Sequence, residues 1–107
     1  MNNSLKIAEH FDDFCAGGEE AAEFRVACID GPFDAGEIIS LDFLGVRNMN
    51  SSFCNALIAN LAARDGEKGV RRLRFLNCNA TIQVHIRAAI GIGLARYQAT
   101  HLESHST

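Results

Sequence analysis

The segment at residues 37–44 constrains the fold of this chain more than any other part of the sequence. It reads EIISLDFL, is mostly β-branched or apolar, and ends at Gly45. Strands that are covered on both faces of a parallel sheet have this nearly continuous apolar character. The segment therefore predicts a central parallel strand over residues 38–43.

Strand-like and helix-like segments alternate along the rest of the chain. Residues 5–8 and 72–76 have the composition of two further strands. Apolar residues at helical spacing predict helices over residues 19–29, 51–64 and 81–97. The resulting order, strand–helix–strand–helix–strand–helix, predicts an α/β fold, with a small single-layer sheet of three or more mostly parallel strands and packed helices.

The limits of the first helix follow from local signals. Gly17 and Gly18 precede it, and glutamates crowd its start, where the helix dipole favours negative charge. Asp30-Gly31-Pro32 is a typical helix stop. The side chains expected to share its apolar face are Phe24, Ala27 and Cys28.

The second helix has the clearest amphipathic pattern. Phe53, Leu57 and Leu61 recur at intervals of four residues, which predicts a stripe buried against the sheet. Ser51 or Ser52 can cap its start, and Gly66 is a natural residue just beyond its end.

The third helix begins after Asn79 or Thr81, either of which can cap it. One of its faces is apolar and can cover the sheet, through Ile82, Ile86, Ile90 and Leu94. A second apolar strip consists of Val84, Ala88 and Ile92. Because one small sheet cannot bury both faces, the second strip predicts a partner, most simply a second copy in a C2 homodimer, although small exposed apolar strips also occur without a partner.

A chain of 107 residues has the length of one domain. We expect a domain over residues 1–97, followed by a flexible tail over residues 98–107 with the polar sequence QATHLESHST. The hydrophobic fraction of 48% argues against disorder over most of the chain. An apolar leader and an apolar run of about 20 residues are both absent from the sequence, so we expect a cytoplasmic protein.

Four cysteines occur without any CxxC spacing, at positions 15, 28, 54 and 78. In a cytoplasmic protein this pattern predicts reduced thiols that pack as small apolar side chains. The missing ligand spacing argues against zinc, and we expect neither a metal nor a cofactor.

Charge is distributed unevenly, although the net charge is only −3. Residues 1–63 carry a net charge of −7, and residues 64–96 carry +5. The acidic balance argues against a general nucleic-acid binder. The asymmetry fits either a dipolar solvated surface or a docking face for a partner of opposite charge.

Two polar connectors follow predicted strands, at residues 45–52 and 77–79. In open α/β sheets, ligands and partners bind at the carboxyl ends of the strands, where these connectors lie. Neither connector contains a histidine that could activate a serine, which argues against a serine hydrolase. The candidate partner- or ligand-binding residues at this edge are Asp42, Asn48, Asn50, Ser51, Ser52, Asn77 and Asn79.

Three short segments here resemble a known family. They read LDFLGV at residues 41–46, MNSSF at 49–53 and NAL at 55–57. Together they resemble the STAS-like family, small domains of largely unassigned function that are related to the STAS domains of anti-sigma-factor antagonists. The resemblance covers roughly residues 5–96.

The resemblance implies a non-catalytic regulatory module. In antagonist STAS domains, a histidine-kinase-like ATPase docks at the serine loop and phosphorylates a serine at the helix start. The matching position is Ser52, with Ser51 beside it. The sequence departs from that pattern at Asn50, where aspartate is usual, and at Phe53, where glycine is usual.

Two other functions use the same edge. One is a small-ligand or nucleotide-binding domain, and the other is a small enzyme with Cys54 or Ser52 as nucleophile. A concave apolar pocket of roughly 300 Å³ or more beside Ser52 would favour a ligand. A flat polar edge would favour a protein partner.

Overall fold

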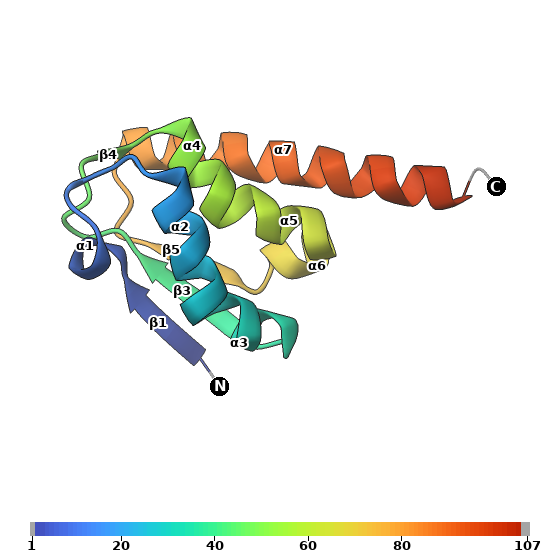
Figure 1. Cartoon of the computed structure of the whole chain (residues 1–107), viewed down its shortest axis with the longest axis horizontal. Helices are drawn as coiled ribbons and strands as arrows, with labels where there is room; N and C mark the ends of the chain where they lie inside the picture. The colour runs from blue at the N-terminus through green and yellow to red at the C-terminus, as the bar shows by residue number, and fades with distance from the viewer. Residues whose placement is uncertain (1, 106–107) are drawn as a thin grey trace.

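The computed structural model describes residues 2–105, and the side chains of residues 3–101. Three strands form one parallel sheet in the order β1-β3-β5 (Figure 1). They are β1 (Asn2–Lys6), β3 (Ile38–Asp42) and β5 (Leu73–Leu76). Because β3 pairs with both neighbours, the prediction of a central parallel strand in an α/β fold is confirmed.

Each connection between the strands is helical. The first contains α1 (Ile7–His10), β2 (Phe14–Cys15), α2 (Gly18–Phe24), the π-helical segment η1 (Arg25–Ile29) and α3 (Asp30–Asp34). The second contains β4 (Asn48–Met49), α4 (Ser51–Cys54), the π-helical segment η2 (Asn55–Ala59), α5 (Asn60–Asp65) and α6 (Glu67–Val70). The chain continues into α7 (Ala80–His105). The short strands β2 and β4 pair in parallel as a separate small sheet.

The helices cover only one face of the main sheet. Ile39 and Leu41 point into the core and are fully buried, whereas Ser40 and Asp42, which alternate with them, stay partly exposed. The prediction that this strand is covered on both faces is therefore wrong. The two polar residues within the apolar run belong to the face that the helices leave open.

The first helical connection is longer than predicted. Pro32 does not stop it, because the π segment η1 ends at Ile29 and Pro32 falls in the first turn of α3, where an amide hydrogen needs no helical partner. The predicted apolar face is also partly wrong. Ala27 is exposed, and the wider π turn instead buries Arg25 and Ile29.

The second helical run begins at Ser51 and confirms the predicted stripe. Phe53, Leu57 and Leu61 are all fully buried in the core. Its cap, however, is Asn50, whose side chain accepts a hydrogen bond from the Phe53 amide at 2.9 Å. The prediction of a serine cap is wrong because an asparagine one position earlier satisfies the same first-turn amide. Gly66 follows the helix with φ 65°, as predicted.

The last helix, α7, starts as predicted at Asn79, whose side chain accepts a hydrogen bond from the Ile82 amide at 2.8 Å. It packs on η2 and α5, and Gly93 permits this because an added Cβ would overlap the Ala59 carbonyl. The helix continues beyond the predicted end to His105 (Figure 1). Neither glycine nor proline interrupts residues 98–105. Ser106 and Thr107 lie outside the described residues, and the flexibility of the tail stays a prediction.

A buried ion-pair network joins the two helical connections. Arg25 forms two hydrogen bonds of 2.8 Å with the Asp30 carboxylate, and Arg64 in α5 binds the same carboxylate at 2.9 Å. Only 11% of the Arg25 side chain is exposed. The network fixes the position of η1 and α3 relative to α5.

Candidate docking site

The serine loop is anchored by Asn50. Its backbone amide donates to the Cys15 carbonyl at 3.1 Å, and its Nδ2 donates to the Ala16 carbonyl at 2.9 Å. Both contacts attach the start of α4 to the segment that precedes α2. Because Asn50 also caps α4, neither serine is needed for capping, and both Ser51 and Ser52 are exposed in the first helical turn.

Ser52 lies against the start of α2. A Cβ added at Gly18 would overlap the Ser52 hydroxyl, so glycine at position 18 allows the two helix starts to approach closely. The first turn of α2 carries Glu19 and Glu20. Any negative charge added at Ser52 would therefore lie near two carboxylates, as well as near the positive end of the α4 dipole.

Asp42 and Asn77 form a second polar group, at the ends of β3 and β5. The Asp42 carboxylate accepts hydrogen bonds of 2.9 Å from Asn77 Nδ2 and from the Leu44 amide. These bonds, the one from Asn77 first, lower the pKa of Asp42, and nearby Lys6 acts in the same direction. Asn77 has φ 56°, a left-handed conformation that asparagine tolerates well.

The remaining asparagines hold loops together. Asn79 Nδ2 donates to the carbonyls of Val46 and Arg47, at 3.3 and 3.0 Å. The Asn48 side chain accepts from the Met49 amide at 2.8 Å. The carboxamides of the predicted edge are thus used within the chain, whereas Ser51 and Ser52 are exposed, with the Ser52 hydroxyl beside Gly18.

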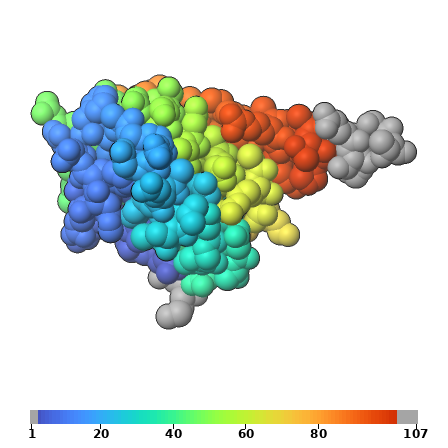
Figure 2. Space-filling view, in the orientation of Figure 1, coloured from blue at the N-terminus to red at the C-terminus, as the bar shows by residue number. Residues whose placement is uncertain are grey.

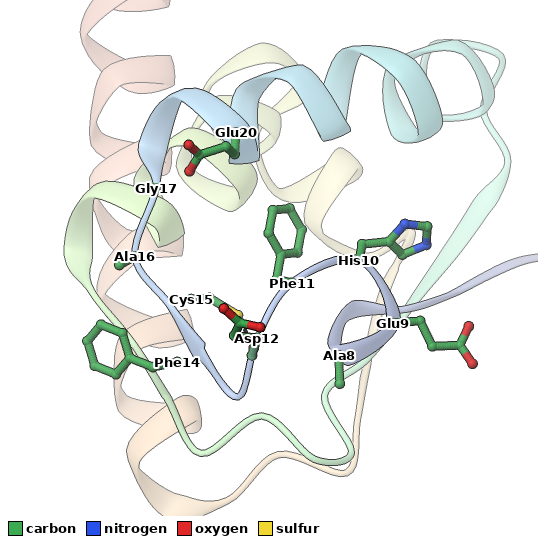
Figure 3. Close-up of a pocket in the computed structure, with 10 residues that line it drawn as sticks. All are labelled: Ala8, Glu9, His10, Phe11, Asp12, Phe14, Cys15, Ala16, Gly17 and Glu20. Carbon is green, nitrogen blue, oxygen red and sulfur yellow. Dashed lines mark hydrogen bonds between the residues drawn. The ribbon is translucent and has the colours of Figure 1, made fainter.

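A polar hollow lies on the α2 side of the serine loop (Figure 3). It has a volume of about 620 Å³ and is wide open. Asp12 and Glu20 bring carboxylates to its lining, and Glu9 and His10 line it as well, although the Glu9 carboxylate points outwards (Figure 3). Gly17 lies at its border towards Gly18. The lining does not include Ser52. The hollow could not be predicted from the sequence, because nothing there indicated that residues 8–17 fold against the serine helix.

The N-terminal segments and the serine loop form one end of the molecule. Figure 2 shows the blue N-terminal region and the green region of the serine loop bordering each other at the same end. The pairing of β2 with β4 explains this arrangement, since it joins Phe14 to Asn48 and Cys15 to Met49. The resulting surface carries part of the acidic excess noted in the first half of the chain, through Glu9, Asp12, Glu19 and Glu20.

The buried cysteines have the properties of core residues. Burial raises the pKa of the Cys54 thiol to about 12, and its Sγ donates to the His85 carbonyl at 3.2 Å. Burial, with smaller contributions from Asp12 and Asp13, raises the pKa of Cys15 to about 11. All four cysteines are free thiols. Cys54 therefore lacks the lowered pKa that a nucleophilic thiol requires.

Within residues 2–105, no helix is sufficiently long and apolar to cross a bilayer. Among the side chains of residues 3–101, no cluster of three or more histidine, cysteine or acidic groups could hold a metal ion.

Comparison with known proteins gives one match. A family model described as a STAS-like domain of unknown function (DUF4325) matches residues 20–83, which is more than half of the chain. The matched part includes most of α2, the central strand β3, the serine loop and β5. No curated protein and no solved structure matches the chain significantly.

Proposed function

Because the chain belongs to the family of STAS-like domains of unknown function, we propose that it is a regulatory module that docks a partner protein through the Ser51–Ser52 loop. The observation that carries this proposal is the separation of two roles at the start of α4. Asn50 caps the helix, and the two serine hydroxyls are left exposed at the same edge.

The charge of this edge favours a basic partner surface. Glu9, Asp12 and Glu20 line the neighbouring hollow, and Glu19 stands in the first turn of α2. Opposite charges steer association and select partners. A histidine-kinase-like ATPase with a basic docking surface is the partner that we propose.

Phosphorylation of Ser52 would act on this contact. In the proposed step, the Ser52 hydroxyl oxygen takes the γ-phosphoryl group of ATP, its proton is released, and ADP leaves. The phosphate adds about −1.5 to −2 charge. Beside Glu19 and Glu20 this charge makes the edge still more acidic and fills the narrow space next to Gly18, so it alters the docking surface rather than the core.

Asn50 explains one departure from the antagonist pattern. An aspartate at this position could accept from the Phe53 amide, but it could not donate to the Ala16 carbonyl as Asn50 does. Phe53 explains the other departure, because it fills the core and packs edge-on against Phe11, with ring centroids 4.8 Å apart. Both substitutions fit a serine loop that is held rigidly against the N-terminal segment.

Recognition of a partner protein fits these residues better than catalysis or the binding of a nucleotide. Among the described residues, no histidine is hydrogen-bonded to Ser51 or Ser52, and Cys54 is a buried, neutral thiol. The carboxylates of the hollow would repel the phosphates of a nucleotide. We therefore propose a role in protein recognition.

The last helix offers a separate contact for a second copy of the chain. Val84 and Ile92 are 63% and 40% exposed, and Ala88 lies between them on the same face of α7. We propose that this strip forms a C2 homodimer contact, on a different surface from the serine loop.

The phosphorylation step is tested by mass spectrometry of the protein isolated from its source organism. We expect a fraction heavier by one phosphate group, with the phosphate located on Ser52 by fragmentation. The fraction should vanish in Ser52→Ala and persist in Thr81→Ala, a matched change in the first turn of α7. Protein that is never phosphorylated, or that carries the phosphate elsewhere, would contradict the proposed switch.

A further inference from the structure

The outer edge of β5 has backbone groups available for another strand. Within the described residues β5 pairs only with β3, through bonds such as Ile39 amide to Arg72 carbonyl at 2.8 Å and Phe43 amide to Leu76 carbonyl at 2.9 Å. Successive residues of a strand direct their backbone groups to opposite sides. The amides and carbonyls of Leu73 and Phe75 therefore point away from β3.

A groove runs beside this edge, between β5 and the first turns of α7. Figure 1 shows β5 as the strand nearest to α7. The groove has a volume of about 540 Å³ and an apolar floor formed by Phe75, Ile86 and Ile90. Gln83 and Arg87 lie at its rim, and Gln83 Nε2 is held by the Cys78 carbonyl at 3.0 Å. A strand added to β5 would place every second side chain over this floor.

The charges around the groove are mainly positive. Arg74 projects from β5 on the open face of the sheet, where its guanidinium binds only the Arg71 carbonyl, at 2.9 Å. Among the described residues, neither Arg74 nor Arg87 pairs with a carboxylate. Asp42 lies near one end of the groove, but Asn77 and the Leu44 amide already bind it.

We propose that this groove binds an extended segment of a partner protein as a fourth strand beside β5, with apolar residues at alternate positions and acidic residues between them. The apolar side chains would pack on Phe75, Ile86 and Ile90. The acidic side chains would lie on the open face next to Arg74, where an opposite charge on the neighbouring strand is favourable.

The charges also argue against a second copy of the chain as the occupant. If the β5 edges of two copies were paired, their Arg74 side chains would meet, and like charges on neighbouring strands are destabilising. The proposed strand addition does not depend on the serine loop, which lies at a different edge.

Amide hydrogen exchange followed by NMR tests the proposal on the whole chain. The probe is a short capped peptide of alternating valine and glutamate. In the free protein, the amides of Leu73 and Phe75 should exchange faster than those of Arg74 and Leu76. The peptide should slow exchange at Leu73 and Phe75 at least tenfold, because it would bind their amide hydrogens.

Two control peptides test the contributions of charge and of backbone hydrogen bonding separately. A peptide with lysine in place of glutamate should bind at least about fivefold more weakly, because it reverses the charge beside Arg74. The valine–glutamate peptide with methylated backbone nitrogens should not protect Leu73 or Phe75. Equal binding of the lysine peptide, or binding without protection at these two amides, would overturn the proposal.

Matched variants complete the test. Arg74→Glu and Arg87→Glu should weaken the valine–glutamate peptide at least about fivefold. Arg96→Glu, an exposed change on α7 outside the groove, should leave its affinity unchanged. An equal loss of peptide affinity in all three variants would show only nonspecific charge attraction and would overturn the proposal. The melting temperature of each variant shows that the fold is intact.

Discussion

Arg25 donates its Nε hydrogen to the carbonyl oxygen of Ala56 at 2.9 Å, and this bond links the two π-helical segments η1 and η2. The same guanidinium holds Asp30 through its Nη1. A single nearly buried side chain thus connects the helical run after β1 with the run that begins at the serine loop.

Loss of the contacts made by Arg25 should lower the stability of the fold. Arg25→Met should lower the free energy of unfolding by about 3 kcal/mol, because it removes the two hydrogen bonds to the partly buried Asp30 carboxylate, which then keeps only Arg64, and the bond to the Ala56 carbonyl. Urea denaturation measures the change. The matched control is Arg47→Met, since Arg47 is 84% exposed and pairs with Asp13 at 3.6 Å; it should cost less than about 1 kcal/mol. Similar losses in both variants would contradict the role given to Arg25.

The Leu57 side chain should dominate the packing of the serine helix. Leu57 is fully buried, so Leu57→Ala should cost about 2–5 kcal/mol of unfolding free energy. Val26→Ala removes methyl groups from a side chain that is 62% exposed and should be nearly neutral. Thermal or urea unfolding compares the two variants, and a neutral Leu57→Ala would be incompatible with the observed core.

The central strand and the buried stripe of the serine helix could be predicted because each leaves a periodic apolar signal. The open face of the sheet could not, since Ser40 and Asp42 interrupt the apolar run of β3 without showing which side is covered. The π segments leave no periodic signal either, yet they determine that Arg25 is buried and Ala27 is not.

At the candidate site, residue types were predicted more successfully than their contacts. The sequence placed Ser51, Ser52 and the asparagines in connectors after strands, and the structure has them there. The cap at Asn50 was missed because three consecutive residues, Asn50 to Ser52, are all good caps. The closeness of Gly18 to Ser52 depends on the pairing of β2 with β4, which the two-residue strands do not reveal in sequence.

The two hydrogen bonds of the Asn50 side chain should make separate contributions to the free energy of unfolding. Asn50→Asp keeps the acceptor for the Phe53 amide but loses the donor to the Ala16 carbonyl, and should cost about 1–2 kcal/mol. Asn50→Ala loses both bonds and should cost more, by about 1 kcal/mol. If Asn50→Asp unfolds at the same urea concentration as the natural chain, the link to Ala16 contributes nothing to stability.

Alkaline pH should weaken the fold through Cys54. Its thiol has a pKa near the ordinary 9.0 in the unfolded chain, and burial raises that pKa to about 12 in the folded protein. Because the folded pKa is the higher one, the neutral thiol favours the fold below pH 9, and this contribution declines between pH 9 and about 12. Urea denaturation across this range should show a shallower decline in Cys54→Ala. An identical decline of stability in both proteins would show that ionisation of Cys54 does not cause it.

The exposed strip of α7 should mediate self-association. Light scattering of the concentrated protein is expected to show a dimer, and Ile92→Glu should convert it to a monomer by placing a charge in the contact. Gln83→Glu adds the same charge at an exposed position on a different face of the same helix and should preserve the dimer. A monomeric natural chain, or a dimer unaffected by Ile92→Glu, would contradict a dimer contact at this strip.

Ser52→Asp should block docking without unfolding the domain, because its larger side chain fills the space beside Gly18 and changes the shape of the contact, whereas its charge alone would attract a basic partner. Ser52→Asp places a carboxylate at an exposed helix start, where the dipole offsets part of the repulsion from Glu19 and Glu20, so the cost should stay below about 1 kcal/mol. With a photocrosslinking residue in place of Ser51, the yield of crosslinked partner should fall in Ser52→Asp. Thr81→Asp, the same charge change at the start of α7, should leave the yield unchanged.

The most direct test of docking at the serine loop is photocrosslinking in the source organism, with the photoreactive residue in place of Ser51, which is exposed beside Ser52. The account predicts crosslinks to one protein, a histidine-kinase-like ATPase identified by mass spectrometry, and no such product when the same residue replaces Thr81. A chain that gives no crosslink from position 51, or the same products from both positions, would contradict it.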